Sequence, residues 1–156
     1  MAYLIDGKIG VNITDTSSTI SDALGNRYIG SDSAQYIYVL SGAAIPASSY
    51  VTINETFTAI AGTKTAVDDG HEIGFAPEAT VASGKYFYAS LRGRPQLRVA
   101  SLCAADVALY TTSTAGLLDD TATSQTKIDG IVIVTANATG SGTSTAIATW
   151  PRSATF

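Results

Sequence analysis

The sequence predicts an all-β protein, and three observations lead to that class. Ala, Thr and Ser supply 61 of the 156 residues, whereas Glu occurs three times and Lys four times, and this shortage of good helix formers argues against a helical bundle. Apolar and polar residues alternate with period two in several segments, and turn residues separate these segments at intervals of roughly 8 to 12 residues. We therefore expect a small antiparallel barrel or sandwich of about eight to ten short strands.

The N-terminal segment, 1–33, differs from the rest of the chain. Between Asn12 and Asp22 only Ile13 and Ile20 are apolar, so this stretch has little surface to bury. We expect residues 1–33 to form an extended N-terminal arm or a loosely attached segment, and residues 34–156 to form a single β domain. The arm also carries apolar side chains that we interpret as candidate contacts with a partner: Tyr3, Leu4, Ile5 and Ile9.

The strands expected in the first half follow the alternating segments in order. Two of them alternate clearly, and Ser41, Gly42 and Pro46 separate them as loop residues. A segment rich in Thr and Ala follows, then a short strand that stops at Pro77, then an aromatic strand closed by Gly93 and Pro95. The expected ranges are 35–40, 50–57, 57–66, 73–76 and 84–91.

The second half predicts a similar series. Residues 97–101 form one strand, and residues 107–110 and 117–118 form a hairpin whose loop contains Gly116. The aliphatic strand 131–134 is expected to be buried on both faces, and residues 143–150 form the last strand before Pro151. Only residues 101–106 are expected to form a helical turn.

One pattern recurs between the two halves. Gly74, inside a short apolar strand, precedes Gly84 by ten residues, and Gly130 precedes Gly140 by the same spacing. Both places put an apolar strand, a loop of small residues and an alternating strand in series, which indicates a duplicated hairpin.

Charge and composition exclude several functions. The net charge is −4, so we expect no basic face for direct nucleic-acid binding. The single cysteine, Cys103, forms no internal disulfide. No apolar run approaches the length of a membrane span, and the start of the chain lacks the basic region of a secretory signal. We expect synthesis in a cytoplasm and no membrane partner.

Candidate catalytic and metal-binding residues are few. Asp68, Asp69, His71 and Glu72 form the one cluster of potential ligands, but an Asp-Asp-Gly turn that opens a strand is ordinary hairpin chemistry. One histidine, one cysteine and three glutamates leave few general acids or bases. We therefore expect no enzyme activity, no catalytic residue, no cofactor and no metal.

Two groups of residues are candidate binding surfaces. Three of the nine positive charges lie within seven residues, at Arg92, Arg94 and Arg98, and a basic turn of this kind suits an acidic partner surface. Tyrosines are the second group, because a tyrosine ring with its hydroxyl can stack on a sugar; half of such rings in strands face the core instead. The tyrosines concerned are Tyr36, Tyr38, Tyr50, Tyr86 and Tyr88. Trp150, beside Pro151, is interpreted as a clasp on the barrel in preference to a binding platform.

Residues 70–150 resemble the small all-β capsid decoration, or cement, proteins of tailed bacteriophages. The clearest likeness is the strand Ala104-Ala105-Asp106-Val107-Ala108-Leu109-Tyr110, which is followed by a short Thr/Ala loop with Gly116 and the pair Leu117-Leu118. Upstream, Gly74-Phe75-Ala76 leads through a Gly84 turn to a strand ending in Leu91-Arg92-Gly93. Downstream, Asp129-Gly130-Ile131-Val132-Ile133 is followed by a Gly-rich turn and a last strand. The long N-terminal third departs from that group.

The resemblance implies a structural protein of the virion. Such a protein binds the major capsid protein on the exterior of the assembled capsid, stabilises the shell without catalysis, and forms a homo-oligomer, with a trimer favoured. The alternative, based on the tyrosines, is a carbohydrate- or receptor-binding module of a virion fibre or tail appendage.

Overall fold

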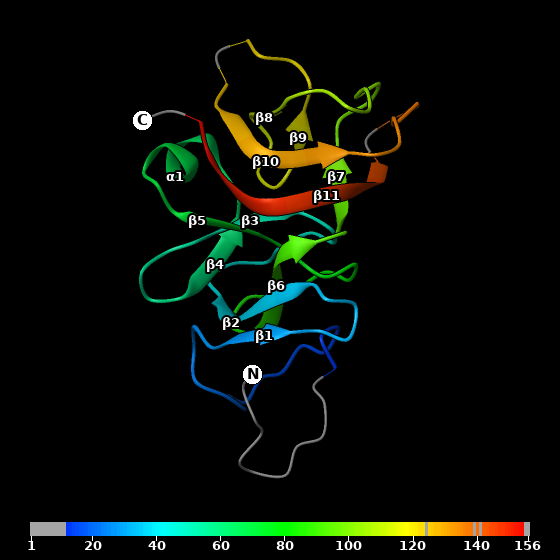
Figure 1. The fold of residues 1–156 in the computed structure, drawn as a ribbon. Helices are drawn as coiled ribbons and strands as arrows, with labels where there is room; N and C mark the ends of the chain where they lie inside the picture. The colour runs from blue at the N-terminus through cyan, green and yellow to red at the C-terminus, as the bar shows by residue number, and fades with distance from the viewer. Residues whose placement is uncertain (1–11, 124, 139, 141, 155–156) are drawn as a thin grey trace.

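The described residues form a nearly all-β structure, which confirms the predicted fold class. The structure is a computed structural model that describes residues 12–123, 125–138, 140 and 142–154. Within these ranges lie eleven strands and one short helix, and all the strands join in one hydrogen-bonded sheet. The sheet closes on itself twice, so the fold contains two small barrels, one above the other in Figure 1.

The first barrel takes strands β2 to β6. Its strands lie in the cyclic order β2-β4-β3-β5-β6, and the β2–β6 pairing closes the ring. Every pairing is antiparallel except the parallel β2–β4 pair. Its interior is filled by aliphatic and aromatic side chains, among them Ile37, Val51 and Phe87. The strand bounds are Gln35–Ser41, Tyr50–Ile53, Thr58–Ala61, Glu72–Phe75 and Tyr86–Gly93 for β2 to β6.

The second barrel repeats this topology with strands β7 to β11. The cyclic order is β7-β9-β8-β10-β11, closed by β11–β7, and the parallel pair is again formed by the first and third strands, β7 and β9. Leu97, Leu118 and Ile133 are among its buried side chains. The strand bounds are Gln96–Val99, Leu109–Thr111, Leu118–Asp119, Lys127–Ile133 and Gly142–Ser153 for β7 to β11.

The repetition places the two expected hairpins in equivalent positions, as the fourth and fifth strands of each barrel. It extends to the loops. Ile45, between the first and second strands of barrel one, exchanges backbone hydrogen bonds with Val81 in the loop before the fifth strand. In barrel two the carbonyl of Cys103, in the equivalent first loop, accepts from the backbone N–H of Asn137 in the equivalent later loop. Ile45 and Cys103 are both fully buried, so Cys103 fills the place that an isoleucine fills in barrel one.

The two barrels are joined by strand pairing and by a shared core. β6 pairs with β11 through Gly93–Ala148 and Arg92–Thr149. Tyr50 and Phe75 from the outer side of barrel one, and Val67 of helix α1 (Lys64–Asp68), belong to the same buried cluster as the interior of barrel two. The junction is therefore packed as a protein core, not as a flexible linker.

Residues 12–33 lie against barrel one. Strand β1 (Arg27–Ile29) pairs with the first half of β2, and Ser17 bridges to Tyr86 of β6. Ile13, Leu24 and Tyr28 pack on a cluster of buried tyrosines on the outer side of the barrel, which comprises Tyr36, Tyr38 and Tyr88. The candidate contacts Tyr3, Leu4, Ile5 and Ile9 lie outside the described residues.

Several expectations about local structure are wrong. The strand expected over 50–57 ends at Ile53, because Asn54 Oδ1 accepts from the backbone N–H groups of Thr56 and Thr58 and forms a turn. The strand expected over 57–66 is limited to β4, and the chain enters a helix at Lys64. The helix is Lys64–Asp68, not residues 101–106, because Thr63 follows the preceding strand and its Oγ1 caps the helix by accepting from the Ala66 N–H at 3.3 Å. Strand 131–134 is not buried on both faces. Ile131 and Ile133 point into barrel two, whereas Val134 is exposed, because β10 is a wall of a closed barrel with solvent outside.

Candidate functional site

The candidate binding site is an exposed sheet face that spans both barrels. Strand register places Ile29 of β1, Gln35 of β2, Arg92 of β6 and Thr149 of β11 side by side in successive strands. Directly opposed residues share a face of a sheet, and Ile147 lies on the same face, two residues before Thr149. We call this surface the β1-β11 face. In Figure 1 its strands β1, β2, β6 and β11 run one above another at the front of the molecule.

Large apolar side chains are exposed on this face. Ile29 is 72% exposed, Trp150 43% and Ile147 42%. Single exposed apolar residues are normal on a protein surface, but several on one continuous sheet are characteristic of a contact surface. Arg92 is also exposed there. The ion pairs formed within the described ranges hold Arg27, Lys64 and Lys127, which leaves the Arg92 charge available to a partner.

Trp150 is held in place by a defined set of contacts. The Arg27 guanidinium lies 5.6 Å from the centre of the Trp150 ring, within the range of a cation–π interaction. Arg27 Nη2 donates to both carboxylate oxygens of Glu72, at 2.8 and 3.0 Å. Three strands, β1, β5 and β11, therefore contribute to the position of one indole ring, consistent with the expected clasp, although much of the ring remains in contact with solvent.

A β-bulge presents Trp150 to the surface. Asp129 of β10 is opposite Arg152 and Ile131 is opposite Ala148, so Gly130 alone faces residues 149–151. Trp150 adopts the left-handed region, with φ of 58°, which costs a non-glycine residue about 1–2 kcal/mol. Gly130 is required opposite it, because an added Cβ would lie 2.9 Å from the Thr149 carbonyl oxygen. The bulge also explains why β11 continues past Pro151, the residue expected to end it.

The three candidate arginines occupy different surroundings. Arg92 lies on the β1-β11 face. Arg94 lies in the turn after β6 and lines a groove. Arg98 is on β7, opposite Thr143 of β11, and its backbone N–H donates to Ser48 O at 2.7 Å. The three arginines thus lie on β6, on the turn after it and on β7. Of the three, Arg92 is the one that strand register places on the β1-β11 face.

The groove has a volume of about 390 Å³ and a mixed polar and apolar lining. Tyr36 donates from its hydroxyl to Asp32 Oδ2 at 2.8 Å, and burial followed by the Asp32 contact raises the pKa of Tyr36 above its ordinary value. The rings of Tyr36 and Tyr88 are buried, so neither offers an open face for stacking. The lining also includes Ile13, Glu78, Arg94 and Gln96.

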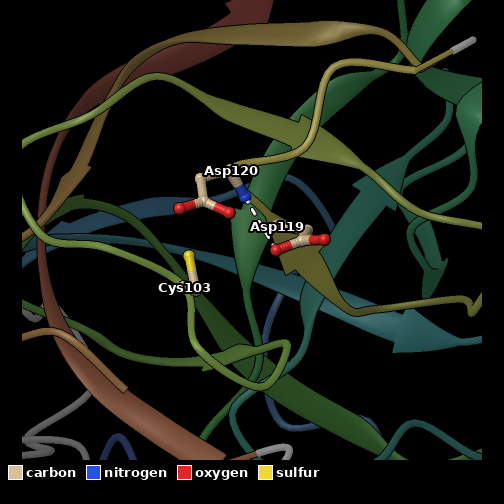
Figure 2. A group of neighbouring side chains, drawn as sticks. All are labelled: Cys103, Asp119 and Asp120. Atoms are coloured by element: carbon tan, nitrogen blue, oxygen red, sulfur yellow. Dashed lines mark hydrogen bonds between the residues drawn. The ribbon is translucent and has the colours of Figure 1, made fainter. Parts of the chain in front are cut away.

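Cys103, Asp119 and Asp120 form a compact group, shown in Figure 2, in which one candidate ligand atom from each residue lies within 4.8 Å of the others. Hydrogen bonds to nearby backbone groups explain why these three side chains lie together. Asp120 Oδ2 accepts from the Ala104 N–H at 2.9 Å, and Asp119 Oδ1 accepts from the Asp120 N–H at 2.9 Å. Burial, and then the two carboxylates, raise the pKa of the Cys103 thiol to about 11, so the sulfur is a neutral thiol near neutral pH. These contacts agree with the role of Cys103 as a buried side chain in the core of barrel two.

The acidic turn at residues 68–72 is a candidate cation site in the sequence, but two of its carboxylates form separate ion pairs. Asp68 pairs with Lys64 and accepts from the Thr126 hydroxyl, whereas Glu72 pairs with Arg27. The Lys64 hydrogen bond, followed by the one from Thr126, lowers the pKa of Asp68. These carboxylates therefore serve two separate contacts.

No family model matches the chain, and no curated protein matches it in sequence. The helix in the described part of the chain is too short to cross a membrane.

Proposed function

We propose that this chain is a non-enzymatic structural protein of a virion that binds the outer surface of the assembled capsid and stabilises it. The observation that carries the proposal is the β1-β11 face, where exposed apolar side chains lie on β1, which pairs with barrel one, and on β11 of barrel two. The same face carries Arg92, which has no ion pair among the described residues. The resemblance of residues 70–150 to capsid decoration proteins supplies the class of partner.

The composition suits this role. Charged residues make up 14% of the chain, so broad areas of surface can be desolvated in an interface without leaving charges unpaired. A standard protein interface buries on the order of 1,600 Å² in total, and a homo-oligomer, with a trimer favoured, multiplies modest contacts through effective concentration. A protein that binds the assembled shell but not its separate subunits stabilises the shell by mass action.

Binding to particles tests the proposal. Purified protein is mixed with expanded capsids that the encoding virus assembles without it, and the capsids are sedimented and then heated. We expect saturable co-sedimentation and a higher temperature of capsid disruption. Protein that stays in the supernatant, or that binds unassembled capsid subunits as tightly as capsids, contradicts the proposal.

The alternative, a carbohydrate- or receptor-binding module, takes its support from the groove. The buried tyrosine rings make stacking on a sugar unfavourable there. Binding to a glycan array that is lost in Arg94→Ala, without capsid binding, is the result that favours this alternative.

A further inference from the structure

We infer that Trp150 is the side chain by which the β1-β11 face binds its protein partner, entering an apolar recess of the partner next to a carboxylate that pairs with Arg92. This inference rests on the proposed function and identifies the contact that the function uses. The partner is thus a protein surface with an apolar hollow and an acidic rim.

The first line of support is the conformation of the strand. An unbulged strand alternates its side chains and needs no left-handed residue. Here residues 149–151 face Gly130 alone, and a tryptophan takes a φ of 58°. Bulges often re-aim a side chain next to a functional site. The result is a ring that is 43% exposed, which is unusual for a residue with so much apolar surface.

The second line of support is preorganisation. Arg27 lies over the ring and is itself fixed by two hydrogen bonds to Glu72. A ring that is ordered before binding loses little conformational entropy when it enters a pocket. Tryptophan and arginine are also the residue types enriched among those that dominate binding energy.

The third line of support is charge. Glu72 neutralises Arg27. Arg92 lies opposite Gln35 and Thr149 and has no ion pair among the described residues, so it offers a positive charge on this face. A buried guanidinium needs an acidic partner. The partner chemistry that fits is therefore apolar with a carboxylate, as opposed to a second cationic or sugar-bearing surface.

The test compares the binding of variants to the undecorated capsids used above. Trp150→Ala, Ile29→Asp and Arg92→Glu each change the face, and Leu102→Ala is the matched control, because Leu102 is 73% exposed in the β7–β8 connection. Ile29 and Arg92 are exposed, so their variants keep the test valid if Trp150→Ala does not fold. Circular dichroism and sedimentation velocity monitor the fold and the oligomeric state.

We expect Trp150→Ala to weaken binding by about tenfold or more, Ile29→Asp and Arg92→Glu to weaken it as well, and Leu102→Ala to bind as the wild type does. Raising the salt concentration should weaken the wild type more than Arg92→Glu. If the wild type binds and all three face variants bind equally well, the inference is wrong while the proposed function stands. If the variants change the oligomeric state instead, the face joins copies of this chain and the inference is also wrong. Absence of wild-type binding overturns the proposed function itself.

Discussion

The contact between the two barrels can be tested at Gly62, where a single added methyl group has a large predicted effect. Gly62 follows β4, and its carbonyl accepts from the Gly116 N–H of barrel two at 2.8 Å. A Cβ at Gly62 would lie 1.9 Å from Tyr50 Cε2 and 2.3 Å from Cδ2. Both separations fall far below the 3.4 Å at which ordinary van der Waals contact begins, and Tyr50 is fully buried between the barrels.

The ring therefore has no free space into which it can retreat. Overpacking of a core costs about 1–3 kcal/mol and occasionally more, and we expect Gly62→Ala to lie at the upper end, near 3 kcal/mol. For a chain of this size such a loss lowers Tm by about 6–12 °C. Urea unfolding followed by circular dichroism gives the free energy of unfolding, and differential scanning calorimetry gives Tm.

A double-mutant cycle isolates the cause. Tyr50→Ala alone should cost about 3–5 kcal/mol through loss of buried surface, but Gly62→Ala added to it should cost less than about 1 kcal/mol, because the clashing ring is gone. Gly70→Ala is the control: its added Cβ has no atom within 4 Å, and only its φ of 80° opposes the change, at about 1–2 kcal/mol. A steric clash with Tyr50 is excluded if Gly62→Ala costs no more than Gly70→Ala, or costs the same with and without the Tyr50 ring.

Three further predictions concern Cys103 and Asp68. In the folded protein, the Cys103 thiol should not react with a disulfide reagent at pH 8, because Cys103 is buried and its pKa is about 11. It should react once denaturant is added. Rapid labelling of the native state contradicts the assignment of Cys103 to the core. In the same assay series, Cys103→Val should be more stable than Cys103→Ser, since a buried hydroxyl without a partner is costly. The folded-state pKa of Asp68 is lowered by Lys64 and Thr126, so its contribution to stability is present above the unfolded value near 3.8 and is lost as pH falls through the lower folded value. In urea unfolding, Asp68→Asn should therefore reduce the free energy of unfolding more at pH 7 than at pH 2. Asp69→Asn, the control for loss of one charge, should show little such difference. Equal effects of both substitutions at both pH values argue against the Lys64 contact.

Local sequence patterns are enough to predict the fold class and the positions of most strands along the chain. Alternation over residues 35–40 and the Gly-containing loop between residues 107–110 and 117–118 are such patterns, and they predict strands and hairpins because side-chain direction repeats every two residues. The echo of Gly74 and Gly84 in Gly130 and Gly140 likewise indicates the repeated hairpin. The helix at Lys64–Asp68 escapes prediction because its signal is only the Thr63 cap and five residues, too short for a helical periodicity to be visible.

The closure of the strands and the meeting of distant side chains depend on the tertiary structure. The sequence of residues 131–134 does not indicate that a barrel closes on one side of this strand. Likewise, the sequence around Trp150 does not indicate its contacts with Arg27 and Glu72, which lie 123 and 78 positions earlier. The same holds for Arg92, Arg94 and Arg98, neighbours in sequence that strand geometry distributes to different surroundings. Period-two patterns specify the side of a strand, but the pairing of distant strands specifies what lies on that side, and that pairing is set by the packing of the whole chain.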